Sequence, residues 1–469
     1  MSKSWLTFFK NTPSQSLLKK SEELAILAFQ RATEGVPTYK RLLQERDINP
    51  AEVKDIDTFK ELVPIIDKKT TFIAYQDRIK ELGINGDLED VASILTSSGH
   101  SGSFSFGLIT NKDLKEIGKL IDSTLDYHIG IAGKKTVLIN CLPMGVRFPT
   151  KECVVAEVSV RSDMALALVR GFGRDFDQII FVGENSFMKE VLEEGLEQGI
   201  NWSSLDVCII VGEEDFPENY REYIAYLLGK DLDKVDKIIV ASSMGISEIG
   251  LSVFQESKDT IRIRRQAQRN SNLRYALFGE DIEICPMLFH FYPTRTYVEE
   301  EPASYDGEMK DYDLVITNLD LQAKLPLIRY NTKDRGRIIL YDKLAEILNR
   351  YKLQELLPEL KLPLVAVSGR GKKIRHGDIN LYPEQIKAAI YSDFELARAT
   401  TANFKMKKKD SQVVIEMQLK KGTEKKGELQ AKFSEAIFKY TGVQLEVILY
   451  PYHQFPYPLD YERKFRYID

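Results

Sequence analysis

Apolar and polar positions along the chain follow two alternating patterns, one typical of helices and the other of buried strands. The stretch SEELAILAFQRA repeats apolar residues at helical spacing and predicts a helix within residues 21–45; the stripe consists of Leu24, Leu27, Ala28 and Ala32. The runs KKTVLINCLP, DQIIFVG, LDVCIIVGEE and VDKIIVASSMG are short and apolar throughout, and predict buried strands. SFMKEVLEEGLEQ and ENYREYIAYLLGK, which lie among them, predict helices. Apolar strands alternating with amphipathic helices indicate an α/β fold whose sheet is covered on both faces.

The pattern changes twice in the second half of the chain. Strand patterns follow one another without helices at about 281–340, which predicts an antiparallel β subdomain. After the Gly-Arg-Gly sequence at 369–371 the chain restarts, with predicted helices at 383–391 and 425–440 and predicted strands at 412–419 and 443–450. We therefore expect a large N-terminal domain, residues 1–369, and a small α+β C-terminal domain, residues 370–469.

Composition excludes several classes of protein. The chain has 469 residues, 43% of them apolar and 29% charged, with a net charge of −5, so a dominant basic face for nucleic acid is not expected. The strongest basic cluster, KMKKKD at 405–410, is interpreted as a solvated loop edge. No stretch has the length of a membrane span or the pattern of a signal peptide. The four cysteines lack the spacing of a zinc site, so we expect a reduced, cytoplasmic protein with free thiols: Cys141, Cys153, Cys208 and Cys285.

The stretch ILTSSGHSGSFSFG, residues 94–107, contains a run at 97–102 that is made only of hydroxyl side chains, glycines and one imidazole. Closely spaced backbone amides and small hydroxyls can surround a polyphosphate, although small polar loops are more often plain turns. The Gly-Lys-Ser/Thr ending of the P-loop is missing, so this is not the loop of a P-loop NTPase.

Three further positions strengthen the phosphate interpretation. Glu248 follows a predicted strand, where the sheets of α/β proteins place ligands, and its carboxylate suits a Mg²⁺ ion bound to phosphates. Asp334 is expected in a turn after a strand-like run, where it could bind ribose hydroxyls. Arg370 lies between two glycines at the predicted domain boundary.

The order of these motifs resembles the acyl-adenylate-forming (ANL) superfamily, and within it the phenylacetate–coenzyme A ligase family. The matching segments span nearly the whole chain; they are GVPTYKRLLQERDINPAEVKDIDTFKELVPIIDK, TSSGHSG, VGEEDFPENYREYI, MGISEIG, LVITNLDLQAKLPLIRYNTKDRGRI and GRGKKIRHGDINLYPEQI. The resemblance implies a large multi-subdomain α/β domain and a small mobile C-terminal domain. It also implies ATP/AMP, Mg²⁺ and coenzyme A or a phosphopantetheine carrier as cofactors.

The resemblance also implies roles for individual residues. The residues that would hold the β- and γ-phosphates are Ser97, Ser98, Gly99, His100, Ser101 and Gly102. Those expected near adenine are Gly212, Glu213, Met244 and Gly245. Ser247 would touch the α-phosphate, Glu248 would bind Mg²⁺, and Asp334, assisted by Arg370, would bind the ribose. Lys372 falls at the hinge position.

The sequence departs from the family at three places. His100 replaces a threonine, and Met244 replaces an aromatic residue. The end of the chain, FPYPLDYERKFRYID, replaces the family's Pro-Arg-x-x-Gly-Lys, so that Arg463 occupies the position of the catalytic lysine and Lys464 stands beside it. In a strand the two side chains would point in opposite directions, so we expect only one of them in the site.

The resulting prediction is an ATP-dependent ligase that activates an aryl or fatty acid as acyl-AMP and transfers it to a thiol. The thiol acceptor could be coenzyme A or an acyl carrier protein, and the protein could form a homodimer. Two alternatives stay open, an acyl-protein synthetase-like transferase and a degenerate, non-catalytic nucleotide-binding protein. The altered phosphate loop and tail favour the second alternative, whereas Glu248, Asp334 and Arg370 oppose it.

Overall fold

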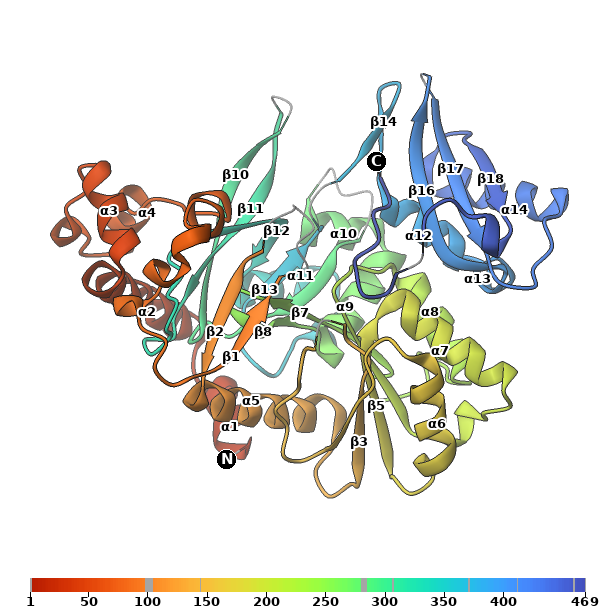
Figure 1. The fold of residues 1–469 in the computed structure, drawn as a ribbon, viewed down its shortest axis with the longest axis horizontal. Coiled ribbons are helices and arrows are strands. Elements are labelled where there is room, and N and C mark those ends of the chain that lie inside the picture. The colour runs from red at the N-terminus through yellow and green to blue at the C-terminus, as the bar shows by residue number, and fades with distance from the viewer. Residues whose placement is uncertain are drawn as a thin grey trace.

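The computed structural model shows a mixed α/β protein in two parts (Figure 1). It describes residues 2–97, 104–143, 145–279, 285–305, 308–369, 372–410, 412–458 and 460–468. Five residues of the predicted phosphate loop and Arg370 lie outside these ranges; the five are Ser98, Gly99, His100, Ser101 and Gly102. None of the helices in the described ranges combines the length and the apolar character that crossing a lipid bilayer requires.

One eleven-stranded sheet runs through the large part, in the order β10-β11-β12-β13-β9-β8-β7-β6-β5-β3-β4. Its parallel half contains β3 (Thr136–Asn140), β4 (Val154–Glu157), β5 (Gln178–Glu184), β6 (Val207–Gly212) and β7 (Val240–Ile246). Its antiparallel half contains β8 (Gly250–Gln255), β9 (Met287–His290), β10 (Thr296–Tyr305), β11 (Glu308–Asn318), β12 (Tyr330–Ile339) and β13 (Leu364–Val367). The strands of the predicted antiparallel region are therefore antiparallel, and they are hydrogen-bonded into the same sheet as the parallel strands.

Helices cover both faces of the parallel half, as the apolar strands predict. Successive strand residues point to opposite faces. Val137 and Ile139 therefore pack in the core that contains α6 (Ser162–Phe172), α7 (Asn185–Glu197) and α8 (Glu218–Leu227). Leu138, between them, packs on the other side with α5 (Asn111–Ile129) and α9 (Lys258–Arg269). α10 (Ser271–Phe278) and α11 (Tyr341–Arg350) form a further core with β9, β12 and β13.

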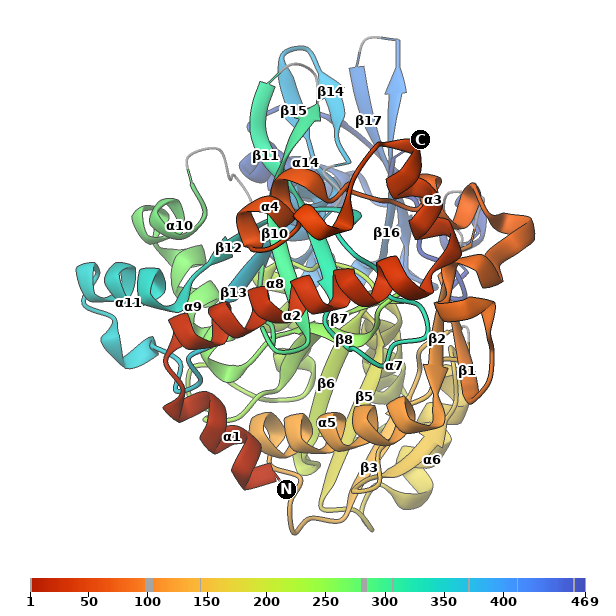
Figure 2. The same cartoon turned by 90° about the vertical axis from the view of Figure 1, so that its left-hand side faces the viewer.

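The N-terminal helices pack on the antiparallel half of the sheet. α1 (Ser2–Asn11) lies beside α5, and the long α2 (Ser14–Gly35) crosses β10 and β11 (Figure 2). α3 (Pro37–Glu45) and α4 (Ile56–Leu62) complete this layer. The predicted stripe is confirmed in part, because Ala28 and Ala32 are buried in the core that α2 shares with Tyr297, whereas Leu27 is 44% exposed.

A separate hairpin, β1 (Val91–Thr96) and β2 (Phe106–Thr110), carries the small-residue loop. Its strands are antiparallel, with Thr96 opposite Phe106. The Ser97 N–H donates to the Ser105 carbonyl at 3.0 Å, which closes the base of the loop.

The C-terminal part is an α+β unit (Figure 1). It comprises β14 (Ile374–His376), β15 (Ile379–Leu381), α12 (Pro383–Tyr391), α13 (Phe394–Ala399), β16 (Thr400–Lys409), β17 (Gln412–Leu419), α14 (Gly427–Thr441) and β18 (Glu446–Tyr450). The structure corrects the interpretation of KMKKKD as a loop edge, because 405–409 lie in β16. Lys405 is buried, and its ammonium group donates to the Arg466 carbonyl at 2.9 Å.

The two parts share a continuous apolar core. Tyr223 of α8 packs its ring 5.4 Å from that of Phe394 and 5.7 Å from that of Tyr391. Polar groups also cross the boundary: the Asn219 amide donates to the Ala388 carbonyl at 2.9 Å, and the Lys189 ammonium to the Thr400 carbonyl at 2.7 Å. Moving the C-terminal unit would expose these buried groups.

Candidate active site

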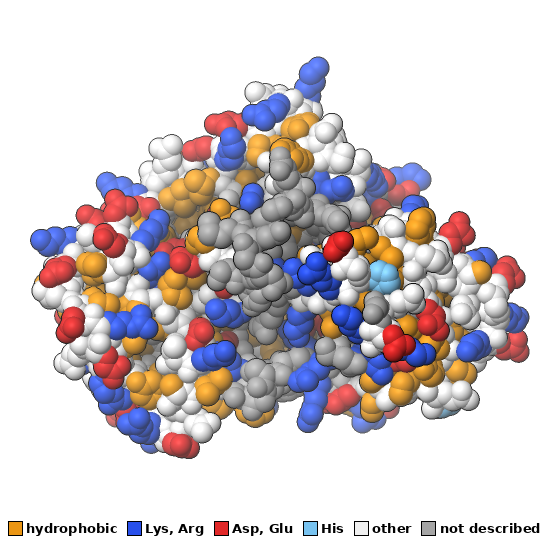
Figure 3. Space-filling model, turned by 90° about the horizontal axis from the view of Figure 1, so that it is seen from above, with side chains coloured by type: hydrophobic (Ala, Val, Ile, Leu, Met, Phe, Trp, Pro, Cys, Tyr) orange, Lys and Arg blue, Asp and Glu red, His pale blue; other side chains and the backbone are white. Residues whose placement is uncertain are grey.

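A cavity of about 1220 Å³ lies between the sheet, α5, the hairpin and the C-terminal unit. Ligand pockets usually measure about 300–1,000 Å³, so this one has room for more than one small ligand. Several loops that follow parallel strands open into it, where α/β sheets bind ligands. When the molecule is seen from above, Lys and Arg side chains gather near the centre of the upper face (Figure 3).

The Ser97 end of the cavity is polar. The Ser97 hydroxyl accepts from the Ser105 N–H at 2.9 Å and from the Lys68 ammonium at 3.3 Å. Lys68 and Lys69 line the cavity here. A cation therefore lies beside Ser97, and it comes from a segment that precedes the hairpin in the chain.

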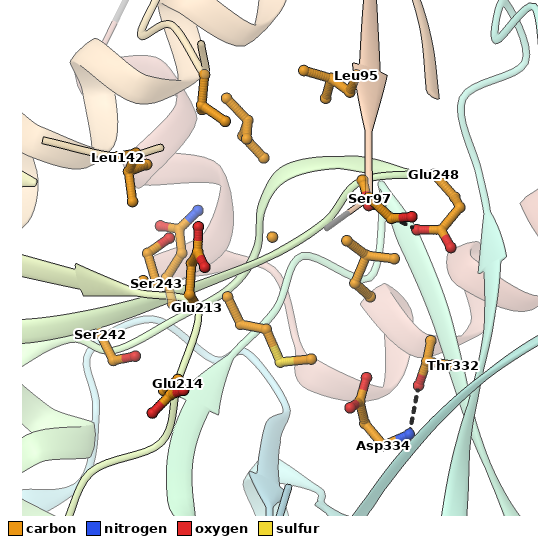
Figure 4. Close-up of a pocket in the computed structure, with 18 of the residues that line it drawn as sticks. Leu95, Ser97, Leu142, Glu213, Glu214, Ser242, Ser243, Glu248, Thr332 and Asp334 are labelled. Carbon is orange, nitrogen blue, oxygen red and sulfur yellow. Dashed lines mark hydrogen bonds between the residues drawn. The ribbon is translucent and has the colours of Figure 1, made fainter. Parts of the chain in front are cut away.

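Glu248 lies near Ser97, in the turn that follows β7 (Figure 4). Its carboxylate accepts from the Tyr330 hydroxyl at 2.9 Å and from the Ser247 hydroxyl at 3.1 Å. Gly107 of β2 backs this turn so closely that a Cβ on it would lie 2.1 Å from the Ser247 carbonyl oxygen. These contacts bring the MGISEIG and RYNTKD motifs together at one carboxylate.

A metal at this point would depend on other ligands besides Glu248. Among the described residues, no group of three or more His, Cys, Asp and Glu side chains could hold a metal ion. Magnesium is usually held by one or two carboxylates together with substrate phosphates and water. The single Glu248 carboxylate therefore fits Mg²⁺ that arrives with a nucleotide.

The predicted adenine-binding residues follow two neighbouring strands. Gly212 ends β6, and Glu213 comes next with a φ of 73°, a backbone conformation uncommon outside glycine. Burial raises the pKa of the Glu213 carboxyl, against an opposing effect of the nearby Lys464. Met244 and Gly245 belong to β7, and all four residues line the cavity.

Asp334 lies in a strand, which corrects the prediction of a turn. It belongs to β12, where pairing with β11 jumps from Asp313–Arg335 to Val315–Asn331 and leaves extra residues on β12. Lys333, within this bulge, has a φ of 62°. The Asp334 N–H donates to the Thr332 hydroxyl at 3.2 Å (Figure 4). Bulges re-aim side chains beside active sites, and Asp334 lines the cavity.

The tail brings a cation into the cavity. Lys464 lines it and donates from Nζ to the Glu213 carbonyl at 2.6 Å. The neighbouring Arg463 has a side chain that is 81% exposed and lies 3.9 Å from the Asp460 carboxylate. Lys372 of the predicted hinge also lines the cavity.

The carboxylate residue Asp215 lines the wall of the cavity that faces α12. Burial, followed by the charge of Glu384, raises the pKa of Asp215 to about 7. Beside it, the Lys387 ammonium of α12 pairs with the Glu214 carboxylate at 2.9 Å, with both side chains largely buried. The C-terminal unit is thus held to the cavity wall by a buried ion pair.

The rest of the cavity is an apolar branch beneath α5. One face of that helix lines it from Leu114 to Ile129, and side chains of the sheet such as Val182 and Ile210 lie opposite. The fourteen residue-to-residue steps of helix from Leu114 to His128 span about 21 Å at 1.5 Å per step. Such a branch can accept a long or bulky apolar group.

Comparison with known proteins identifies the fold. No protein-family profile matches the sequence, and no curated protein matches it. The structure is similar to that of 2-hydroxyisobutyryl-CoA ligase in the postadenylation state, with a TM-score of 0.71 and 13% identity over 99% of this chain and 91% of that one. It is also similar to an anthranilate CoA ligase in complex with anthranoyl-AMP, with a TM-score of 0.51 and 11% identity over 80% and 66% of the two chains.

The chain has the fold of the acyl-adenylate-forming ligases. The predicted fold class is thereby confirmed, and the sequence resemblance is confirmed at the level of the superfamily fold. The comparisons do not single out the phenylacetate–coenzyme A ligase family.

The similar ligase gives different TM-scores in its different states. Its two postadenylation structures give 0.71 and 0.69. The same ligase in the thioesterification state gives 0.55, with 14% identity over 97% of this chain and 89% of that one.

Proposed function

We propose that the protein is an AMP-forming acid–thiol ligase that uses the cavity for both half-reactions. A carboxylate oxygen of the acid attacks the α-phosphorus of ATP, and the bond to pyrophosphate breaks. A thiol sulfur then attacks the acyl carbon, loses its proton and releases AMP. The observation that carries the proposal is the convergence of Ser97, Glu248, Asp334 and Lys464 on one cavity that continues into an apolar branch.

Each of these residues has a proposed task. Ser97 and Lys68 bind the β- and γ-phosphates, and Ser247 contacts the α-phosphate. Glu248 would hold Mg²⁺, which when bound neutralises phosphate charge; Tyr330 fixes the orientation of the carboxylate. Asp334 accepts hydrogen bonds from the ribose hydroxyls.

Lys464 is the proposed catalytic cation. The adenylation transition state spreads negative charge over the α-phosphate and the attacking carboxylate, so a fixed positive charge beside it lowers the barrier. Lys464 lines the cavity, whereas Arg463 is turned to solvent. The two lysines, Lys68 and Lys464, argue against a non-catalytic protein, because they place positive charge beside Ser97 and beside Glu213.

We propose more specifically that the protein is a ligase of the phenylacetate–coenzyme A ligase type. Its thiol acceptor would be coenzyme A or a carrier-bound phosphopantetheine. The sequence motifs support that subtype. The similar ligase has been captured with 2-HIB-AMP and CoA, which supports coenzyme A as the first acceptor to test.

A screen of pyrophosphate release with MgATP and a panel of aryl and fatty acids tests the proposal. At least one acid should release pyrophosphate and, with coenzyme A, yield a thioester. The proposal would be contradicted if no aryl or fatty acid of the panel raised pyrophosphate release above the rate measured without an acid.

A further inference from the structure

The part of the cavity lined by α5 contains an imidazole whose Nε2 has no hydrogen-bond partner among the described residues. It belongs to His128, which lies near the end of α5 and lines the cavity. Its Nε2 is shielded from solvent. A buried polar atom without a partner costs about 1–3 kcal/mol, so such atoms are uncommon in folded proteins unless something else completes them.

Neighbouring groups do not complete it. The rings of Tyr127 and His290 lie near it, with centroids 4.7 Å and 5.3 Å away, and the His290 Nε2 is instead 3.4 Å from the Tyr292 hydroxyl. Burial, with a smaller effect of His290, holds the pKa of His128 well below its usual range. His128 is therefore a neutral imidazole at physiological pH, able to donate one hydrogen bond and accept another.

His128 also stands on the face of α5 that lines the branch. Ile117, Ile121, Thr124 and His128 recur every three or four residues and all line the cavity. The stripe is apolar at Ile117 and Ile121 and becomes polar at Thr124 and His128. A ligand that enters from the Ile117 side would meet apolar groups first and hydrogen-bonding groups last.

We propose that the acid activated by this protein carries a hydroxyl group on the distal part of a long apolar chain, and that His128 recognises this hydroxyl. The inference rests on the proposed function and names the substrate class for it. A hydroxyl both donates and accepts, so it satisfies either tautomer of the imidazole. Arg295 also lines the cavity, so dicarboxylic acids are included in the test as the competing ligand class.

Matched pairs of acids test this assignment. Straight-chain acids of graded length, from hexanoate to hexadecanoate, are compared with their ω-hydroxy derivatives by kcat/KM for pyrophosphate release. The ω-hydroxy acid should be preferred at least ~10-fold at one chain length, which corresponds to about 1.4 kcal/mol, and less at shorter and longer lengths. A preference that is absent at every length, or a stronger preference for the matching dicarboxylates, would overturn the inference.

Variants of His128 test whether this residue causes the preference for the ω-hydroxy acid. His128→Leu should abolish this preference, with kcat/KM for the ω-hydroxy acid falling to that for the unsubstituted acid. His128→Gln, which keeps a donor and an acceptor, should retain part of the preference. His453→Leu removes an exposed imidazole outside the cavity and should change neither value. A preference that survives in His128→Leu would overturn the role of His128.

Direct binding separates this inference from the proposed function. Titration calorimetry of the same acid pairs with the wild-type protein and His128→Leu needs no turnover. If no acid releases pyrophosphate, the proposed function fails, yet tighter binding of the ω-hydroxy acid to the wild type alone still supports the inference. Equal binding of both acids to both proteins contradicts it.

Discussion

The Nζ of Lys464 donates a hydrogen bond of 2.6 Å to the backbone carbonyl of Glu213, joining the C-terminal tail to the predicted adenine side of the cavity. The two residues are 251 positions apart in the chain. The contact holds an ammonium group at the cavity wall while the neighbouring Arg463 points to solvent.

Replacing the two tail cations separately should give unequal results. Lys464→Ala should slow acyl-AMP formation at least ~100-fold, because a preorganised charge at the transition state is lost. Arg463→Ala is the matched control and should change the rate less than ~3-fold, since its charge is solvated. Stopped-flow release of pyrophosphate measures both rates. A slow Arg463→Ala beside a normal Lys464→Ala would reverse the assignment.

Lys68 should affect nucleotide binding more than chemistry. Its ammonium lies 3.3 Å from the Ser97 hydroxyl, at the proposed phosphate site. A hydrogen bond to a charged group contributes about 1.5–3 kcal/mol, so Lys68→Ala should raise the KM for ATP roughly 10- to 100-fold. Lys54→Ala, which removes an exposed lysine from the preceding segment, serves as the control. An unchanged KM for ATP in Lys68→Ala would remove Lys68 from the phosphate site.

The sequence resemblance implies a mobile C-terminal unit, and a rotation of this unit would have to separate contacts such as that between Asn219 and Ala388. Lys372→Pro fixes φ near −65° at the boundary and should trap one arrangement. We expect one half-reaction to survive and the other to fall sharply, measured as pyrophosphate release and as thioester formation from pre-made acyl-AMP. Lys372→Ala removes the same side chain without fixing φ. Equal losses in both half-reactions with Lys372→Pro would argue against rotation.

Stability should fall as pH rises through neutrality. Burial and the charge of Glu384 raise the pKa of Asp215 to about 7 in the folded protein, above the value of about 4 expected when unfolded. The folded state therefore holds the proton more tightly, and this contribution to stability, complete below about pH 4, is lost as pH approaches 7. Tm should decline between about pH 5 and pH 8.

Asp215→Asn should reduce that decline by removing the titrating group. Some decline should remain, because burial and the charge of Glu214 also raise the pKa of Glu184 to about 7. Asp233→Asn, which alters a carboxylate with 59% side-chain exposure, is the control. Calorimetry at each pH gives Tm. A decline of equal steepness in wild type and Asp215→Asn would show that Asp215 does not titrate in this range.

Local patterns predicted the elements that depend on local physics. Pro383 fits the first turn of a helix, and the structure begins α12 there and ends it at Tyr391, as predicted. The apolar strand runs, buried on both faces, likewise appear as β3, β5, β6 and β7. The order of the motifs was enough to predict the fold, although the sequences of similar structures are only 11–14% identical to this one.

Features that depend on distant partners were not predicted. Lys405 is buried because the tail supplies carbonyls for its ammonium group, including that of Arg466, 61 residues away. The bulge at Asp334 appears only when β12 pairs with β11, and Lys68 meets Ser97 only after the hairpin folds back. The sole sequence signal for Lys68 was its place at the end of the matching N-terminal segment.

The most direct measurement of the central claim is detection of acyl-AMP by mass spectrometry after incubation with MgATP and the best acid of the panel. The wild-type protein should form it. Glu248→Gln should form at least ~100-fold less at an unchanged Tm, because it keeps the shape of the side chain and loses the charge opposite the phosphates. Absence of acyl-AMP from the wild type, or equal amounts from wild type and Glu248→Gln, would contradict the account.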